Sequence, residues 1–246
     1  MKKFTFILFC LAIAFNSQAQ FGNVLKKVQE KADAVLGGNN PLSADQIGAG
    51  LKEALNVGVG EASDFLSTEN GYFESPYKIL LPEEAQVVTK KLRAVPGFSN
   101  IEADLTEKLN RAAEDAANKA KPIFVSAIKQ MTIRDAMDLL MGNQDAATRY
   151  LEKSTYQKLY DEFRPIIIAS LDKVNARQLW NKSTTAYNKL PFVKKTNPEL
   201  DDYVTKQALV GLFGLVEKKE EDIRTNVGSR SSDLLKQVFA KQDGKQ

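Results

Sequence analysis

Residues 199–224 read ELDDYVTKQALVGLFGLVEKKEEDIR, and this stretch decides the fold class. Its centre, residues 208–216, is apolar on every side of a helix, a pattern typical of a helix enclosed by others in a protein core. The apolar run is much shorter than the about 20 residues that a bilayer core requires. We therefore predict a central core helix, with the charged run EKKEED at 217–222 as its solvated end.

The chain on the N-terminal side of this stretch also shows helical periodicity from residue 43 onward. Ser43 with Gln46 has the spacing of a capping box, Thr132 with Asp135 marks the start of a further helix, and Gly142 marks its end. No series of alternating strands accompanies these helices. The pattern therefore predicts an all-α fold, a single multi-helix domain of about eight or nine helices over residues 42–241.

Two features inside this domain need a separate interpretation. The helix that starts at Ser43 contains four glycines, at 48, 50, 58 and 60, but they do not form G-x-G-x-x-G after a strand. Close packing of a neighbouring helix therefore explains them better than a dinucleotide loop does.

The segment 67–82 resists a helical interpretation and carries Tyr72, Phe73 and Tyr77. These aromatic residues either cover the core, which is the favoured interpretation, or form a lid over a pocket.

The composition excludes several classes of site. The chain has 246 residues with no histidine and one cysteine. Without histidine there is no Ser-His-Asp triad, no Cys-His pair and no imidazole metal ligand. With one cysteine there is no internal disulfide framework, zinc finger or iron–sulfur set. We expect no cofactor and no metal site.

Residues 1–19 have the features of a signal peptide. Two lysines at 2 and 3 precede the uncharged run 4–15, and small residues stand at 17 and 19. We expect cleavage after Ala19, a periplasmic or secreted protein, and no transmembrane anchor in the mature chain. Residues 20–41 are expected to form a leading helix, at 23–36, and a linker, and residues 242–246 a polar tail.

The leader also carries much of the net charge. Removal of Lys2 and Lys3 lowers the formal net charge from +3 to +1. A nearly neutral mature chain gives no reason to expect nucleic acid or an anionic membrane as the main partner.

Two segments suggest an internal duplication. Residues 121–131 (KPIFVSAIKQM) and 164–174 (RPIIIASLDKV) are 43 residues apart, and Arg134 and Arg177 have the same separation. This period lies in the range of helical-pair repeats, although chance similarity between helices is the alternative. Pro122 and Pro165 are expected at kinks or at new helix starts.

Candidate ligand-binding residues cluster around these segments in the sequence. We single out Arg134, Arg149, Arg164 and Arg177, which would hold a carboxylate or phosphate if their helices pack together, and Tyr72 and Tyr77 of the aromatic segment. The alternative is that each arginine pairs with a nearby acid or caps a helix.

No catalytic residue is assigned. Adjacent acids such as Glu83-Glu84, Glu114-Asp115 and Glu220-Glu221 diverge on a helix and fit solvated faces better than a paired-carboxylate site. Ser126 and Lys129 have S-x-x-K spacing, but the supporting motifs of Ser-Lys enzymes are missing.

Several segments together resemble a known bacterial family. They are LKEALNVGV (51–59), ILLPEE (79–84), residues 121–167 from KPIFVSAIKQM to DEFRPII, LPFV (190–193), DYVTKQALVGLFGLV (202–216) and SSDLLKQVF (231–239). In this order they resemble the family catalogued as domain of unknown function 4197, over roughly residues 43–240. The resemblance implies a secreted bacterial α-helical domain and supplies no catalytic residues.

The sequence therefore predicts an exported, non-catalytic binding or structural module of the periplasm or cell surface. Its partner would be a small anionic or amphipathic ligand, or a protein. Two alternatives stay open: a histidine-free hydrolase that uses carboxylates or a Ser-Lys pair, and a protein-interaction scaffold that docks through the 23–36 helix or the glycine-rich helix.

Overall fold

The computed structural model describes residues 42–240 and residue 243. The expected leader, the 23–36 helix, the linker and most of the polar tail lie outside the described residues. Nine α-helices and one 3-10 helix make up the described part, with no strand among them. They are α2 (Ala44–Leu66), α3 (Glu83–Leu92), α4 (Ile101–Ala117), α5 (Ala120–Gln130), α6 (Ile133–Leu140), α7 (Ala146–Lys173), α8 (Ala176–Asn188), α9 (Leu200–Thr225), η1 (Val227–Ser229) and α10 (Asp233–Phe239). The predicted all-α architecture is confirmed.

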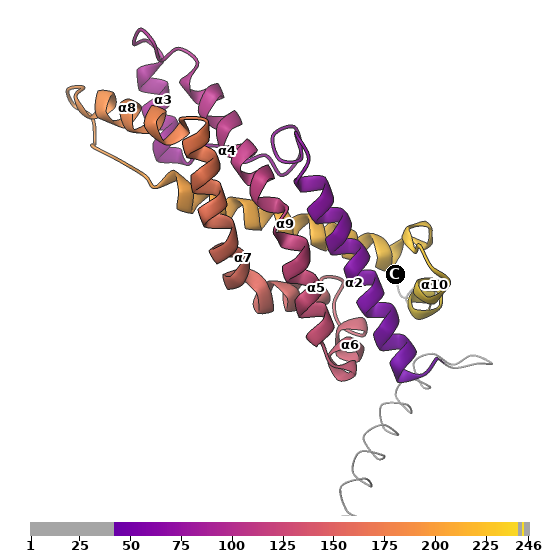
Figure 1. Ribbon diagram of the computed structural model, residues 1–246. Helices are drawn as coiled ribbons and strands as arrows, with labels where there is room; N and C mark the ends of the chain where they lie inside the picture. The colour runs from indigo at the N-terminus through magenta and orange to yellow at the C-terminus, as the bar shows by residue number, and fades with distance from the viewer. Residues whose placement is uncertain (1–41, 241–242, 244–246) are drawn as a thin grey trace, which may run out of the picture.

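The predicted core helix is α9, and α2, α4 and α7 pack against it (Figure 1). The side chains of Leu209, Leu212 and Phe213 are buried there, whereas Val210 is exposed. The Phe213 ring meets Phe124 of α5 edge to face at 5.7 Å and stacks against Tyr156 of α7 at 6.4 Å between ring centroids. Helices α3 and α8 lie together at one end of this elongated bundle (Figure 1). None of the helices in the described part is long and apolar enough to cross a membrane.

The charged run at 217–222 is not simply a solvated end, which corrects the expectation from sequence. Glu220 is buried because its carboxylate accepts the backbone N–H groups of Ala147 and Thr148 at the start of α7. Arg224, one turn later, is also buried and donates to the carbonyl oxygens of Leu139 and Leu140 at the end of α6. These two side chains satisfy helix ends that have no partner within their own helix.

Two glycines show why small residues are needed at helix contacts. A Cβ atom on Gly50 of α2 would lie 2.6 Å from Val238 Cγ2 of α10, and one on Gly211 of α9 would lie 2.9 Å from Tyr72 Cε1. Both distances are shorter than real Cβ contacts, so a larger residue at either position would displace its neighbour. Close packing is therefore the use of Gly50, as the sequence predicted.

The aromatic segment covers the core at Tyr72. This side chain is fully buried, and its hydroxyl donates to Ala208 O of α9 at 2.7 Å. Burial, followed by the nearby charge of Glu114, raises the pKa of Tyr72 far above its ordinary value. Glu114 is itself buried and accepts the N–H groups of Tyr72 and Phe73, so its expected place on a solvated face is corrected. Asn110 holds the same segment through both the N–H and the carbonyl of Ile79, at 2.8 Å each.

The two prolines of the proposed repeat occupy different positions. Pro122 lies in the first turn of α5, at a new helix start, whereas α7 continues through Pro165. Pro165 and Asp161, the residue whose carbonyl loses its helical donor, are both exposed. The breaks after residues 131 and 174 do correspond, since α6 begins at Ile133 and α8 begins 43 residues later at Ala176. The duplication stays a prediction.

Candidate functional site

A cleft of about 320 Å³ lies between the C-terminal half of α7, the start of α8 and the segment that leads into α9. Its lining consists of two arginines, two acids, two asparagines and apolar surface. These residues are Arg164, Ile168, Arg177, Trp180, Asn181, Asn197, Pro198, Glu199, Leu200 and Asp201. The volume is near the lower end of the range for small-molecule sites.

Local structure around α8 holds the walls of the cleft in place. Asn175 adopts a left-handed backbone conformation, with φ 56°, and so separates α7 from α8 by a sharp turn. Trp180 Nε1 of α8 donates to Pro198 O at 3.1 Å. The Asn188 side chain pairs with both the N–H and the carbonyl of Thr196, at 3.1 Å each. The connection from α8 to α9 is thereby tied to α8 at two points.

The start of α9 is joined to α7 by two polar contacts. Arg164 donates to Asp201 at 3.1 Å, and Tyr160, one turn earlier, donates its hydroxyl to Asp202 at 2.6 Å. The hydrogen bond to Asp202 raises the pKa of Tyr160, while hydrogen bonds from Lys206 and then Tyr160 lower the pKa of Asp202. Both aspartates lie in the first turn of α9, where negative charge is favourable.

Both arginines of the cleft retain donors for a ligand. Arg177 pairs with Asp172 at 2.9 Å, but both side chains are about half exposed. Such a surface pair contributes little free energy, so an incoming anion can replace it. Arg164 is bound to Asp201 through Nη2, and its Nη1 makes no hydrogen bond to the described residues, whereas its Nε is buried and out of reach of a ligand. Arginine donors in this arrangement can bind a carboxylate or phosphate group.

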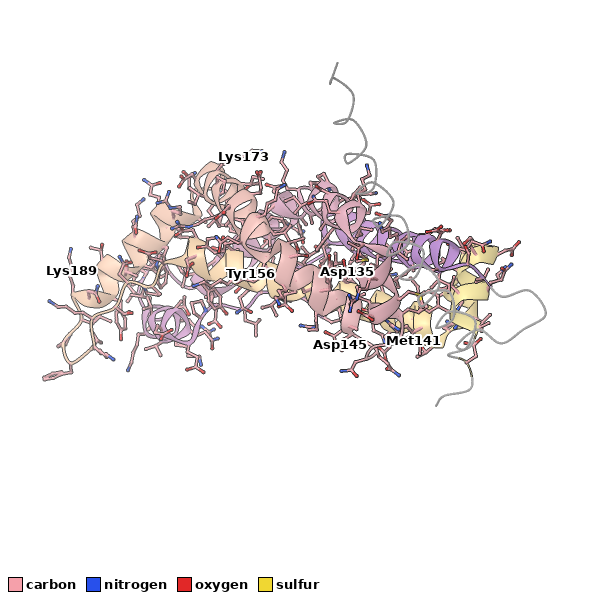
Figure 2. All side chains as sticks on the ribbon, turned by 90° about the horizontal axis from the view of Figure 1, so that it is seen from below. Asp135, Met141, Asp145, Tyr156, Lys173 and Lys189 are labelled. Atoms are coloured by element: carbon pink, nitrogen blue, oxygen red, sulfur yellow. The ribbon has the colours of Figure 1, made fainter. Side chains whose placement is uncertain are left out.

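The other two predicted arginines lie elsewhere. Arg149 of α7 pairs with Asp145 and Glu152 on its own helix and with Glu217 of α9. Arg134 is exposed on α6. Figure 2 shows Asp135 and Asp145, their neighbours in the sequence, close together on one side of Tyr156, whereas Lys189, which follows α8, lies at the far end of the molecule on the other side. The four arginines therefore do not share one site.

The predicted tyrosines also lie outside the cleft. Tyr72 is part of the core, and Tyr77 is half-buried against Gly211 and Gly214 of α9. The aromatic segment therefore does not contribute to this cleft. The predicted ligand-binding set, which combined the two tyrosines with the arginines, would have required it to do so. Instead, Trp180, Asn181 and Asn197 complete the lining. One signal for Trp180 was available in the sequence, since it is the one tryptophan of the chain.

The residues of the hydrolase alternative can be placed as well. Ser126 accepts a hydrogen bond from Gln130 on α5, and neither Ser126 nor Lys129 lines the cleft. Glu199 and Asp201 do line it, but Asp201 is paired with Arg164 and Glu199 is exposed. Among the described residues there is no group of three or more acidic or cysteine side chains that could hold a metal ion.

Comparison with known proteins adds a family and no activity. Residues 41–240 match the family model described as "Protein of unknown function (DUF4197)". No curated protein and no solved structure matches the chain.

Proposed function

The chain belongs to this family, whose description names no activity. From the geometry of the α7–α8 cleft we propose that the protein is a non-catalytic binding module for a small ligand with an anionic group. The observation that carries the proposal is that Arg164 and Arg177, from two different helices, line one cleft together with the single tryptophan of the chain.

The arrangement suits a ligand with one anionic group and a further polar part. Arg177 and the Nη1 group of Arg164, which is not bound to Asp201, offer donors to a carboxylate or phosphate. Asn181 and Asn197 offer neutral hydrogen bonds, and Glu199 offers an acceptor for a ligand amine. A ligand that carries both an acid and an amine would therefore use more of the cleft than a simple anion would.

Tryptophan emission tests this proposal directly, because Trp180 is the single tryptophan of the chain and lies in the cleft. The protein would be titrated with a panel of dicarboxylates, phosphate monoesters and free amino acids. We expect at least one class to change the emission in a saturable manner. Arg177→Gln should then weaken binding about tenfold, as expected for loss of a charge-assisted hydrogen bond.

Arg149→Gln is the matched control, because it makes the same substitution in an ion-paired arginine outside the cleft. The proposal would be wrong if no compound in the panel altered Trp180 emission in the folded protein. It would also be wrong if the Arg149 and Arg177 variants lost affinity equally.

We also propose that the module works in the periplasm or outside the cell. The support is the charged start, apolar run and small residues of positions 1–19. Mass spectrometry of the protein from a periplasmic extract should find a chain that begins at Gln20. Recovery from the cytoplasm with Met1 still present would contradict this proposal.

A further inference from the structure

Phe192 is the most exposed large apolar residue of the described chain. Its relative exposure is 106%, and it lies in the connection between α8 and α9. Its φ of 61° places it in the left-handed region, which is unfavourable for a residue with a bulky side chain. Phe192 therefore carries backbone strain without packing in return, which is typical of a residue retained for function.

The rest of the connection is firmly attached to the domain. Leu190 and Val193, close neighbours of Phe192, are half-buried and pack against the core. The two hydrogen bonds between Asn188 and Thr196 close the base of the loop. The ring of Phe192 thus projects from a loop that is anchored on both sides.

The chain on either side of Phe192, between Asp172 and Glu199, is basic. The chain has no acidic residue in 85–101 or in 173–198, and these two ranges, which we call the basic end, contain nine lysines and arginines. They are brought together because α3 packs against α8 (Figure 1). Within the described part of the chain, seven of the nine make no ion pair. These are Lys90, Lys91, Lys173, Lys182, Lys189, Lys194 and Lys195.

The net charge of the whole chain does not reveal the positive charge of the basic end. Because the whole chain has a net charge of +3, the residues outside the basic end sum to −6. The nearly neutral total, from which we expected neither nucleic acid nor an anionic membrane as the main partner, therefore results from a basic end and an acidic remainder. Lys194 and Lys195 stand two and three residues after Phe192, and Lys189 stands three residues before it.

We propose that the basic end docks on an anionic lipid surface and that Phe192 inserts into the lipid interface. Lysines near an anionic leaflet attract it electrostatically, and an aromatic side chain at the same surface enters the boundary between headgroups and acyl chains. A single aromatic ring on a projecting loop can enter a lipid interface without a preformed pocket. The proposal does not depend on the ligand of the α7–α8 cleft.

A fluorescence reporter at position 192 tests the proposal. In a Trp180→Phe background, Phe192→Trp leaves one tryptophan at the loop tip. The full chain would be mixed with vesicles of brominated phosphatidylcholine, with or without phosphatidylglycerol. We expect a blue shift and quenching with the anionic vesicles and neither with the neutral ones. Because the reporter is local, vesicle binding through another part of the chain leaves it unchanged.

Two further variants distinguish electrostatic attraction to the vesicles from nonspecific hydrophobic binding. Lys189, Lys194 and Lys195 changed together to Gln should reduce the vesicle affinity measured by this quenching roughly a hundredfold. Phe65→Trp in the same Trp180→Phe background is the matched control, since Phe65 is an exposed phenylalanine of α2 outside the basic end, and it should not be quenched.

Three results would overturn the proposal. The first is a tryptophan at 192 that stays in water when anionic vesicles are present. The second is quenching that persists when the three lysines are replaced. The third is a blue shift that grows with protein concentration in the absence of vesicles, because the loop would then bind a second copy of the chain.

Discussion

Glu220 of α9 caps α7 through Thr148. One carboxylate oxygen of Glu220 accepts both the backbone N–H and the hydroxyl of Thr148, at 2.7 Å each, and both residues are buried. The other oxygen accepts the N–H of Ala147 at 3.1 Å and the Nε–H of Arg224 at 2.9 Å. A carboxylate at a helix N-terminus is favoured by both the free N–H groups and the helix dipole.

Replacement of Glu220 by Gln should therefore destabilise the fold. The amide NH2 group replaces one carboxylate oxygen, each of which accepts two hydrogen bonds, so two buried donors lose their acceptor and face a donor instead. We expect the free energy of unfolding to fall by about 2 kcal/mol, measured from urea unfolding followed by circular dichroism. Glu221→Gln is the control, because Glu221 is about half exposed and pairs with Lys218, and its effect should be under about 0.5 kcal/mol. Equal effects of the two variants would contradict the capping role.

Gly211 and Gly214 of α9 should respond to alanine in opposite directions. A Cβ on Gly211 would lie 2.9 Å from the buried ring of Tyr72, whereas a Cβ on Gly214 would lie 3.6 Å from Tyr77, an ordinary contact. We expect Gly211→Ala to lower the free energy of unfolding by about 1 to 2 kcal/mol. Gly214→Ala should raise it by about 0.5 kcal/mol, because alanine is the better helix former. Thermal unfolding of both variants measures the difference, and a stabilising Gly211→Ala would mean that Tyr72 moves aside.

The contact of Asp202 with Lys206 and Tyr160 should make stability depend on acid pH. These hydrogen bonds lower the pKa of Asp202 below its ordinary value of 3.8. A lowered folded pKa contributes stability above pH 3.8, and this contribution is lost as pH falls through the folded pKa. Asp202→Asn should therefore cost about 0.5 kcal/mol at neutral pH and nothing at the acid end. Denaturant unfolding along a pH series tests this, and Tyr160→Phe should reduce the same pH dependence.

Phe192→Asn should separate stability from lipid binding. Asparagine tolerates a positive φ better than phenylalanine does. The exposed ring of Phe192 gains no free energy from burial that would offset its backbone strain. We expect the variant to unfold at a slightly higher temperature, by about 0.5 kcal/mol in free energy. Its co-sedimentation with anionic vesicles should fall at the same time. A loss of stability would instead assign Phe192 a structural role.

The helical segments were predictable because their signals are local. The capping boxes of Ser43 with Gln46 and of Thr132 with Asp135 are both present. They depend on residues three positions apart, which any sequence displays directly. The apolar centre of α9 likewise predicted a core helix, because only a helix surrounded by others can bury such a stretch.

The candidate site was only partly predictable. Arg164 and Arg177 meet at the cleft because the left-handed Asn175 folds α8 back beside α7, and Asp201 reaches Arg164 from 37 positions along the chain. Arg134 and Arg149 look equivalent to them in the sequence, but Arg134 lies on α6 and Arg149 at the start of α7, whereas the cleft lies at the C-terminal half of α7. Helix periodicity gives no information on the angles at which helices pack. It therefore could not predict which of the four arginines line the cleft.

The sequence by itself determined the helical architecture, the position of the core helix and the absence of histidine chemistry. These follow from residue type and from spacings of three or four residues. Only the tertiary structure decided which charges are buried, as at Glu114 and Glu220, and which gather on the surface, as at the basic end. The physical reason is that burial and charge proximity depend on contacts between helices distant in the chain. The acid-free stretches 85–101 and 173–198 are brought together because α3 packs against α8.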